Sequence, residues 1–244
     1  MRIAIVSDIH GNLPALEAVV ADIRRRGADI IVNLGDSLSG PLMPRETAHY
    51  LMAANWPTLA GNHERQILTE PIASQCESDA SASRVLGEAE LAWLRAQPAT
   101  LQLGGDVFLC HGTPQSDVEA LCETVTPAGA RIANDDELRA RLTGRAEALI
   151  ACGHSHVPRL RQHATQCVLN PGSVGLQAFR ATLPYPFYVE TTSPDACYAI
   201  AQKHGSVWQA SLHTVRYDFE PMARLADAGG RPEWAHALRT GRAL

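Results

Sequence analysis

Five short polar loops constrain what this chain can fold into, because each one directly follows an apolar run that is typical of a buried strand. The loops carry Asp, Asn and His side chains, and they are Asp8-Ile9-His10, Gly35-Asp36, Gly61-Asn62-His63-Glu64, His111-Gly112 and Gly153-His154-Ser155-His156. In open α/β sheets, sites form beyond the carboxyl ends of neighbouring strands. We therefore expect the five loops to converge on one polar site.

The N-terminal segments predict a layered α/β fold. Arg2–Val6 is a short run rich in β-branched residues, which is typical of a strand buried on both faces. Asn12 and Pro14 favour a helix start, and Gly27 closes the apolar stripe of that helix. Ile30–Val32 then predicts a second strand, and this strand–helix–strand order is typical of α/β layers.

The rest of the chain predicts more strands and helices in one domain over residues 1–244, with a candidate cap segment around residues 66–100. Further strands are expected over Trp56–Ala60, Asp106–Cys110, Ala148–Cys152, Arg159–Gln162, Gln166–Asn170, Cys197–Lys203 and Ser206–Val215. Helices are expected over Pro44–Ala54, Ser83–Gln97, Ser116–Glu123, Asp135–Thr143, Pro221–Ala228 and Pro232–Arg239. The last two strands are expected to form a hairpin, and the C-terminal half is expected to form an antiparallel or mixed sheet packed on the first.

Composition narrows the function classes. The net charge of −5 argues against non-specific contacts with nucleic acid, which need a basic surface. The six cysteines form no C-x-x-C pair, so neither a disulfide framework nor a zinc ribbon is expected. No signal-peptide pattern and no apolar run of membrane length is present, so we expect a reduced, cytoplasmic protein without a membrane partner. The sequence leaves the oligomeric state open.

The polar loops supply seven candidate metal ligands. They are Asp8, His10, Asp36, Asn62, His111, His154 and His156. Two divalent ions that share one carboxylate would use all seven, and Asp36 is the natural bridge because a carboxylate has two oxygens. Two ions about 3.5–4 Å apart, with a hydroxide held between them as nucleophile, are the usual device for hydrolysing phosphate esters. Four imidazoles with two carboxylates favour transition metals (Mn, Fe, Zn or Ni) over Mg or Ca.

His63 is left outside this ligand set. It adjoins Asn62, and a histidine beside the metals can protonate the leaving alkoxide as general acid. Glu64 either orients His63 or caps the following helix, and Arg65 is expected to be solvated. The sequence identifies no substrate-binding residue. The remaining histidines lack the strand-end setting and are interpreted as surface or hydrogen-bonded residues, namely His49, His163, His204, His213 and His236.

Two further stretches lie outside the five loops and have distinctive compositions. Asn170–Gly175 is a turn by composition, and we expect it to support the His154–His156 loop rather than line the site. Pro184–Tyr188 is rich in aromatic residues and proline, and we expect it to pack on the hairpin rather than cover the site.

Taken together in their order, the five loops resemble the motifs of calcineurin-like metallophosphoesterases, and the resemblance runs from Met1 to about Gly175. It implies a four-layer α/β/β/α sandwich with two mixed sheets. It also implies two ligand sets, one of Asp8, His10, Asp36 and His156 and the other of Asp36, Asn62, His111 and His154. His63 matches the catalytic histidine of the family.

One motif departs from the family pattern. In protein serine/threonine phosphatases and diadenosine tetraphosphatases the second motif is Gly-Asp-x-x-Asp-Arg-Gly, whereas Gly35–Gly40 lacks both the acidic partner of the histidine and the phosphate-binding arginine. The loss of a cationic clamp should matter less for a monoanionic diester than for a dianionic monoester. The departure therefore favours the small prokaryotic phosphodiesterase-like branch, acting on small or nucleotide-like diesters.

Three alternatives stay open beside the phosphodiesterase. A phosphomonoesterase or a serine/threonine protein phosphatase would use the same metals. A non-catalytic scaffold of the same fold would be expected to lose His63 or several ligands, and this chain keeps them. A nuclease is disfavoured by the acidic balance, so the expected partner is a small-molecule phosphoester.

Overall fold

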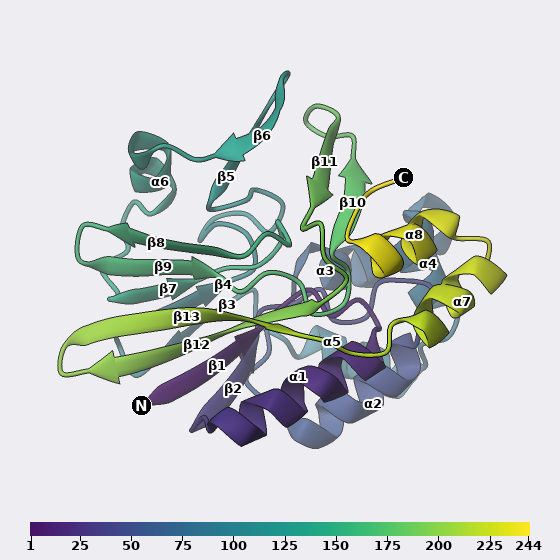
Figure 1. Cartoon of the computed structure of the whole chain (residues 1–244), viewed down its shortest axis with the longest axis horizontal. Helices are drawn as coiled ribbons and strands as arrows, with labels where there is room; N and C mark the ends of the chain where they lie inside the picture. The colour runs from purple at the N-terminus through teal and green to yellow at the C-terminus, as the bar shows by residue number, and fades with distance from the viewer.

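The apolar runs before four of the polar loops form strands of two mixed sheets in the computed structural model, which describes residues 1–244 (Figure 1). The first sheet has the order β13 (Val207–Val215), β12 (Ala196–His204), β1 (Arg2–Val6) and β2 (Ile30–Asn33). The second has the order β3 (Thr100–Leu103), β4 (Val107–Cys110), β7 (Leu149–Ala151), β9 (Gln166–Asn170) and β8 (Arg159–His163). Each sheet combines parallel and antiparallel pairs.

The two sheets bury a shared apolar core. Ile3 and Ile5 of β1 point into a cluster that also contains Leu109 of β4 and Leu169 of β9. Because side chains alternate along a strand, Ala4 and its neighbours on the other face of β1 meet the helices instead. Both faces of the strand are therefore covered, which explains its unbroken apolar sequence.

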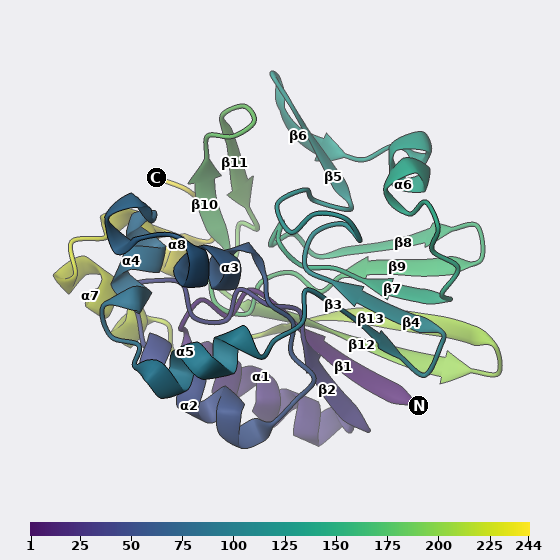
Figure 2. The ribbon, with the colours of Figure 1, turned by 180° about the vertical axis from the view of Figure 1, so that it is seen from behind.

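Helices cover the outer faces of both sheets. On the first sheet, α1 (Leu13–Arg26) packs its apolar stripe on β1 and β12, and α2 (Pro44–Ala54) lies beside it (Figure 2). On the second, Leu138 of α6 (Asp135–Arg141) joins a cluster with side chains of β4, β7 and β9. The predicted four-layer α/β/β/α class is confirmed. None of the helices combines the length and the apolarity needed to span a bilayer.

The stretch that includes the candidate cap is helical. It contains α3 (Asn62–Thr69), a 3-10 turn at Ile72–Ser74, α4 (Glu77–Ser83) and α5 (Glu88–Arg95). Ile67, Ala82 and Leu94 from this stretch share a buried cluster with Ala48 of α2. Two C-terminal helices, α7 (Glu220–Ala228) and α8 (Pro232–Thr240), pack on each other. Helix α8 also contacts β10 (Ala178–Ala181).

Two hairpins rise from the edge at which the site loops lie (Figure 1). One consists of β5 (Glu123–Thr126) and β6 (Gly129–Ile132), and the other of β10 (Ala178–Ala181) and β11 (Phe187–Glu190). Strands β6 and β11 contact each other. Neither hairpin was expected from the sequence, because their alternation is short and the region Ser116–Glu123 had been predicted as a helix. That region is instead a series of turns leading into β5.

Other local predictions were also wrong. Trp56–Ala60 is extended but makes only an isolated bridge, between Thr58 and Asn33. Pro57 has no N–H to donate, so a regular ladder beside β2 is not available. The Leu59 N–H nevertheless donates to the Asn33 carbonyl at 2.9 Å, which holds the segment against β2 and delivers the loop that follows.

The predicted helix over Ser83–Gln97 forms only over Glu88–Arg95, because Ser83 is the last residue of α4 and a turn follows it. Gly87 is the N-cap of α5, and its N–H donates to the Glu90 carboxylate at 2.7 Å.

The C-terminal hairpin was predicted correctly but assigned to the wrong sheet. Its strand β12 pairs with β1 of the first sheet, with Ala199 opposite Ile5, a contact between distant residues that local pattern does not encode.

We predict that Leu109→Ala lowers the free energy of unfolding by about 2–5 kcal/mol, because Leu109 is 1% exposed between the two sheets. Leu160→Ala is the matched control on the same sheet, since Leu160 is 44% exposed. Urea denaturation of both variants measures the difference. Equal stabilities would contradict the assignment of the core to the space between the sheets.

Candidate metal centre

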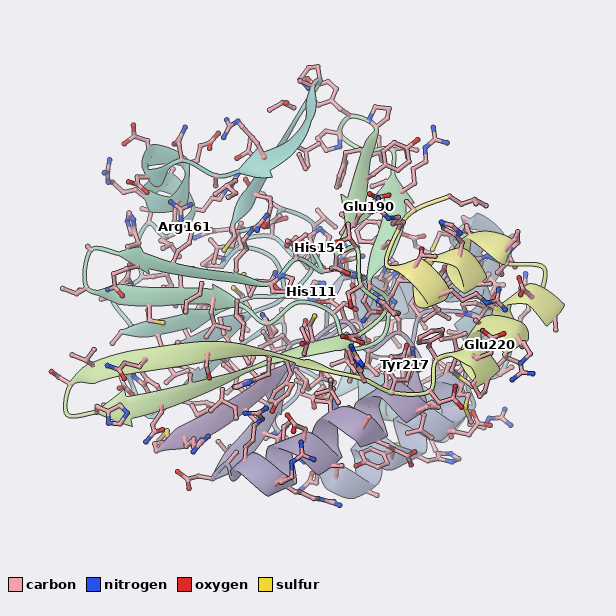
Figure 3. All side chains as sticks on the ribbon, in the orientation of Figure 1. His111, His154, Arg161, Glu190, Tyr217 and Glu220 are labelled. Carbon is pink, nitrogen blue, oxygen red and sulfur yellow. The ribbon has the colours of Figure 1, made fainter.

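The five polar loops meet at one end of the two sheets, where the strands before them end. Figure 3 labels His111 and His154 from two of these loops, near the middle of the view. The loops are tied to each other by backbone hydrogen bonds. The Asp8 N–H donates to Gly35 and the His10 N–H donates to Asp36, both at 3.0 Å, and the Gly153 N–H donates to His111 at 2.7 Å. The convergence expected from the sequence is therefore present.

The backbone of these loops is unusual. Within these loops, five non-glycine residues have φ between 52° and 66°, namely Asp8, His10, Asp36, His154 and His156. Left-handed conformations are uncommon for such residues and cluster at functional sites, where surrounding structure holds them. All five are candidate ligands, so the strain coincides with the residues that the sequence singles out.

The first cluster contains Asp8, His10 and His156, whose ligand atoms lie within 4.8 Å of one another. The Nδ1 of His10 donates to the Ser39 carbonyl at 2.7 Å, and the Nδ1 of His156 donates to the Leu176 carbonyl at 2.6 Å. Burial lowers the pKa of His10 to about 4, so its ring is neutral and Nε2 carries a lone pair. The two Nε2 atoms face each other at 3.2 Å, which suits a shared cation.

The second cluster contains Asp36, His111 and His154. Burial lowers the pKa of His154 to about 4, so the ring is neutral. A neutral ring carries one N–H; when this is on Nε2 it donates to the Val118 carbonyl at 3.1 Å and leaves a lone pair on Nδ1. That lone pair faces the Oδ1 of Asn62 at 3.0 Å, while the Nδ2 of Asn62 donates to Gln66. Two acceptors facing each other at this distance again suit a cation.

Asp36 belongs to groups with residues of both clusters. Its Oδ2 lies 3.0 Å from the Nε2 of His111, and its Oδ1 accepts the His63 N–H at 3.0 Å. Burial opposes ionisation of Asp36, but His111 and His63 hold its pKa well below the ordinary value. Asp36 is therefore an anion placed between the two clusters.

The residues fit bound metal cations. Asp8 is completely buried, and neither of its carboxylate oxygens has a hydrogen-bond partner. The Nε2 of His111 is also buried and makes no hydrogen bond, although the Oδ2 of Asp36 lies 3.0 Å from it. Unpaired buried charge is expensive, whereas coordination of a metal ion would satisfy these atoms. The nitrogen and oxygen donors are those of transition-metal sites.

His63 lies beside both clusters, but its ring nitrogens are not among the atoms whose lone pairs face each other there. Its Nε2 is 3.9 Å from Asp36, and its Nδ1 bonds to the Oδ1 of Asp79 at 2.8 Å. Burial lowers the pKa of His63, but the charges of Asp36 and Asp79 outweigh burial and raise that pKa well above its ordinary value. The ring is therefore able to hold a proton at neutral pH.

Asp79 is a site residue that the sequence analysis missed. It is almost fully buried on α4, 16 residues after His63, in a stretch without a local motif. The acidic partner that is absent from Gly35–Gly40 thus reaches the histidine from another element. Only the packing of α4 against α3 brings the two residues together, so no spacing in the sequence marks the pair.

Glu64 caps the helix rather than orienting His63. Its carboxylate accepts the N–H groups of Asp36 at 2.8 Å, Ser37 at 2.7 Å and Gly61 at 2.7 Å. It therefore joins the start of α3 to the Asp36 loop and fixes both. Arg65 forms a partly exposed ion pair with Asp117 at 2.6 Å.

The turn after β9 supports two site loops, as expected. The Nδ2 of Asn170 donates to the Gly153 carbonyl at 2.6 Å, and the Oγ of Ser173 donates to the Asp8 carbonyl at 2.8 Å. A Cβ at Gly175 would lie 1.7 Å from the Ile9 carbonyl oxygen, so only glycine allows this approach. The histidines outside the motifs join none of the clusters; His49, for example, bonds to Glu90.

The clusters open into a cavity of about 370 Å³. Phe179 and Trp234 line it together with two arginines that the sequence analysis did not single out, Arg180 and Arg231. Arg231 pairs with Glu233 at 2.6 Å and bonds to Ser78 of α4 at 3.2 Å. The cavity therefore combines a cluster of candidate ligands with basic and aromatic walls.

Comparisons with known proteins place the chain among proteins of the same architecture. Residues 1–192 match the model of the calcineurin-like phosphoesterase superfamily domain. An uncharacterised protein of Methanocaldococcus jannaschii is 25% identical over 243 residues, which cover 95% of this chain and 94% of that protein.

Two solved structures share the fold over nearly the whole chain. A metallophosphoesterase from Sphaerobacter thermophilus superposes with a TM-score of 0.75 at 24% identity, covering 99% of both chains. A hypothetical protein from Pyrococcus horikoshii superposes with a TM-score of 0.73 at 17% identity, covering 98% of both chains.

We predict that Mn²⁺ or Zn²⁺ stabilises the protein against thermal unfolding after treatment with EDTA, by about 3 kcal/mol at a free metal concentration near 100 times Kd. Asp36→Asn should lose most of this gain, because Asp36 lies between the clusters. Asp136→Asn is the matched control, with a side chain that is 87% exposed. An equal metal-induced shift in the two variants would contradict the assignment.

Proposed function

The chain belongs to the calcineurin-like phosphoesterase superfamily, and from this membership we propose that it is a dimetal-dependent phosphoester hydrolase that prefers diesters. The observation that carries the proposal is the position of Asp36, which groups with His10 of the first cluster on one side and with His111 and His154 on the other, with His63 alongside. This arrangement supports a site for two ions rather than one.

The ligand sets follow the two clusters. We assign Asp8, His10, Asp36 and His156 to one ion, and Asp36, Asn62, His111 and His154 to the other. Divalent ions held there would acidify water to supply a nucleophile and would neutralise the phosphoryl oxygens. Because only Asp8 and Asp36 bring negative charge, the loaded centre would be net positive and would attract a phosphate ester. Mn, Fe, Zn or Ni all suit this donor set.

His63 acts as the general acid. The Nδ1 contact with Asp79 fixes the ring orientation and favours the protonated ring. The Nε2 proton then faces the clusters, where it can pass to the ester oxygen of the departing alcohol. Asp79 does not touch the reacting atoms, so its role is to position His63.

The charge in the cavity favours a diester. The second motif supplies no arginine, and the charge of Arg231 is offset by Glu233 at 2.6 Å. A monoanionic diester requires less compensation than a dianionic monoester. A phosphomonoesterase is the second candidate, because Arg180 and Arg231 line the same cavity and a guanidinium pairs well with a phosphoryl group. The presence of His63 with the full ligand set supports an enzyme over a scaffold.

The ester preference is tested with bis(p-nitrophenyl) phosphate and p-nitrophenyl phosphate, using protein reconstituted separately with Mn²⁺, Zn²⁺, Ni²⁺ and Fe²⁺. We expect kcat/KM for the diester to exceed that for the monoester by about tenfold or more. Comparable turnover of both esters would overturn the diester preference. No turnover with any metal would overturn the enzymatic function itself.

We predict that His63→Asn lowers kcat by about 10²–10⁴-fold on a diester with an alkyl leaving group, because the departing alkoxide then lacks a proton donor. The loss should be smaller with a p-nitrophenyl leaving group, which departs without protonation. Stabilisation by metal should persist, since His63 is not assigned as a ligand. A loss of equal size for both leaving groups would contradict general acid catalysis.

We predict that Asp79→Asn lowers kcat by about 10–100-fold with the same dependence on the leaving group, because the asparagine holds the His63 ring less firmly. Asp136→Asn serves as the exposed control. If Asp79→Asn lowered kcat equally for alkyl and p-nitrophenyl leaving groups, Asp79 would not act through His63.

A further inference from the structure

A second cavity, of about 750 Å³, adjoins the candidate metal centre and lies between the two hairpins. Its walls come from the loop before β5, from β5 and β6, and from β10 and β11, which stand next to each other in Figure 1. Of its 18 lining residues, 11 are hydrophobic, which is the composition of a site for an organic group rather than for a phosphate.

The two cavities are continuous in their walls. His154 and Phe179 line both of them. The ring of Phe179 packs on His156 with 4.7 Å between centroids, and the Nε2 of His154 bonds to the carbonyl of Val118, another wall residue of the second cavity. A phosphoester bound at the clusters could therefore extend one of its organic groups past these side chains.

The second cavity has little free charge. Glu123 pairs with Arg159 at 2.8 Å, and Arg131 pairs with Glu137 at 2.7 Å. Glu190 lies on the β10–β11 hairpin (Figure 3) and accepts the N–H of Ala243 at 3.0 Å. Because the cations are already paired, the walls offer no clamp for a polyanion, and the occupant should be uncharged.

Exposed apolar side chains gather around this cavity. Val118 is 55% exposed, Leu183 is 81% exposed and Tyr188 is 58% exposed. Exposure of several large apolar side chains together is unfavourable and marks a binding surface. These side chains surround a cavity that shares wall residues with the metal centre. We therefore expect this surface to contact the substrate.

We propose that the second cavity binds a bulky, largely apolar ester group of the substrate, larger than a single phenyl ring. This inference rests on the proposed phosphoester hydrolase function, because the phosphoryl group would bind at the clusters while its apolar substituent fills the second cavity, between the hairpins. The substrate class is then a phosphoester with one large apolar or aromatic substituent. The Pro184–Tyr188 stretch forms the end of the β10–β11 hairpin and the start of β11, and its Pro184, Phe187 and Tyr188 are part of this wall.

The first test measures binding without turnover. Methylphosphonate and naphthalen-2-ylmethylphosphonate have C–P bonds that the proposed reaction does not break, and calorimetry on Mn²⁺-loaded protein gives their affinities. We expect the naphthyl compound to bind about 10–100-fold more tightly, because its rings leave water. Equal affinities would overturn the proposal and would favour a protein partner for the hairpins.

A variant pair locates the effect. Val125→Asp puts a carboxylate into the wall of the second cavity, whereas Val207→Asp makes the same change on β13 at a side chain that is 58% exposed. The affinity ratio of the two phosphonates should fall to near one in Val125→Asp and keep its wild-type value in Val207→Asp. Equal ratios in both variants would place the naphthyl group elsewhere and overturn the proposal.

The outcome is separable from the proposed function. If naphthyl binding is tight but no diester is hydrolysed, the cavity assignment stands and the enzymatic function fails. If diesters are hydrolysed while methyl and naphthyl esters with the same p-nitrophenyl leaving group give equal kcat/KM, the function stands and the cavity assignment fails.

Discussion

The burial of two carboxylates, Asp8 and Asp36, between imidazole rings is the constraint on which the rest of this structure depends. Neither oxygen of Asp8 has a hydrogen-bond partner, and Asp36 is 1% exposed. Such groups are unfavourable in a protein interior unless an opposite charge compensates them. The carbonyl partners of His10 and His156 direct Nε2 lone pairs into the same space, so a cation is the compensation that this geometry accommodates.

The fold provides the rigidity that this arrangement needs. Paired sheets with a common core hold the strand ends, and Glu64 ties the Asp36 loop to the start of α3 through three N–H groups. Left-handed backbone at the candidate ligands is then sustained by structure outside the loops. The helices and hairpins beyond the sheets contribute what the motifs lack, namely Asp79 for His63 and apolar walls beside the clusters. Helices and hairpins outside the motifs can therefore adapt a site that is built from shared motifs to one class of substrate.

The sequence predicted those parts of the site that local pattern encodes. A buried strand and the polar loop after it occupy adjacent positions, so Asp8, His10 and the other candidate ligands could be named, and the structure brings them together. Their role in binding metal stays a prediction. Asp79 could not be predicted, because it reaches His63 only through the packing of α4 on α3. No fixed spacing in the sequence marks such a contact. The pairing of β12 with β1 and the β10–β11 hairpin were likewise missed, since one depends on contact between distant residues and the other on a short, proline-interrupted alternation.

Anomalous X-ray diffraction from crystals grown with Mn²⁺ tests whether Asp36 bridges two metal ions. We predict two anomalous peaks about 3.5–4 Å apart, with a carboxylate oxygen of Asp36 bound to each. Asp8, His10 and His156 should surround one peak, and Asn62, His111 and His154 the other. A single peak, or two peaks that do not share Asp36, would contradict the account.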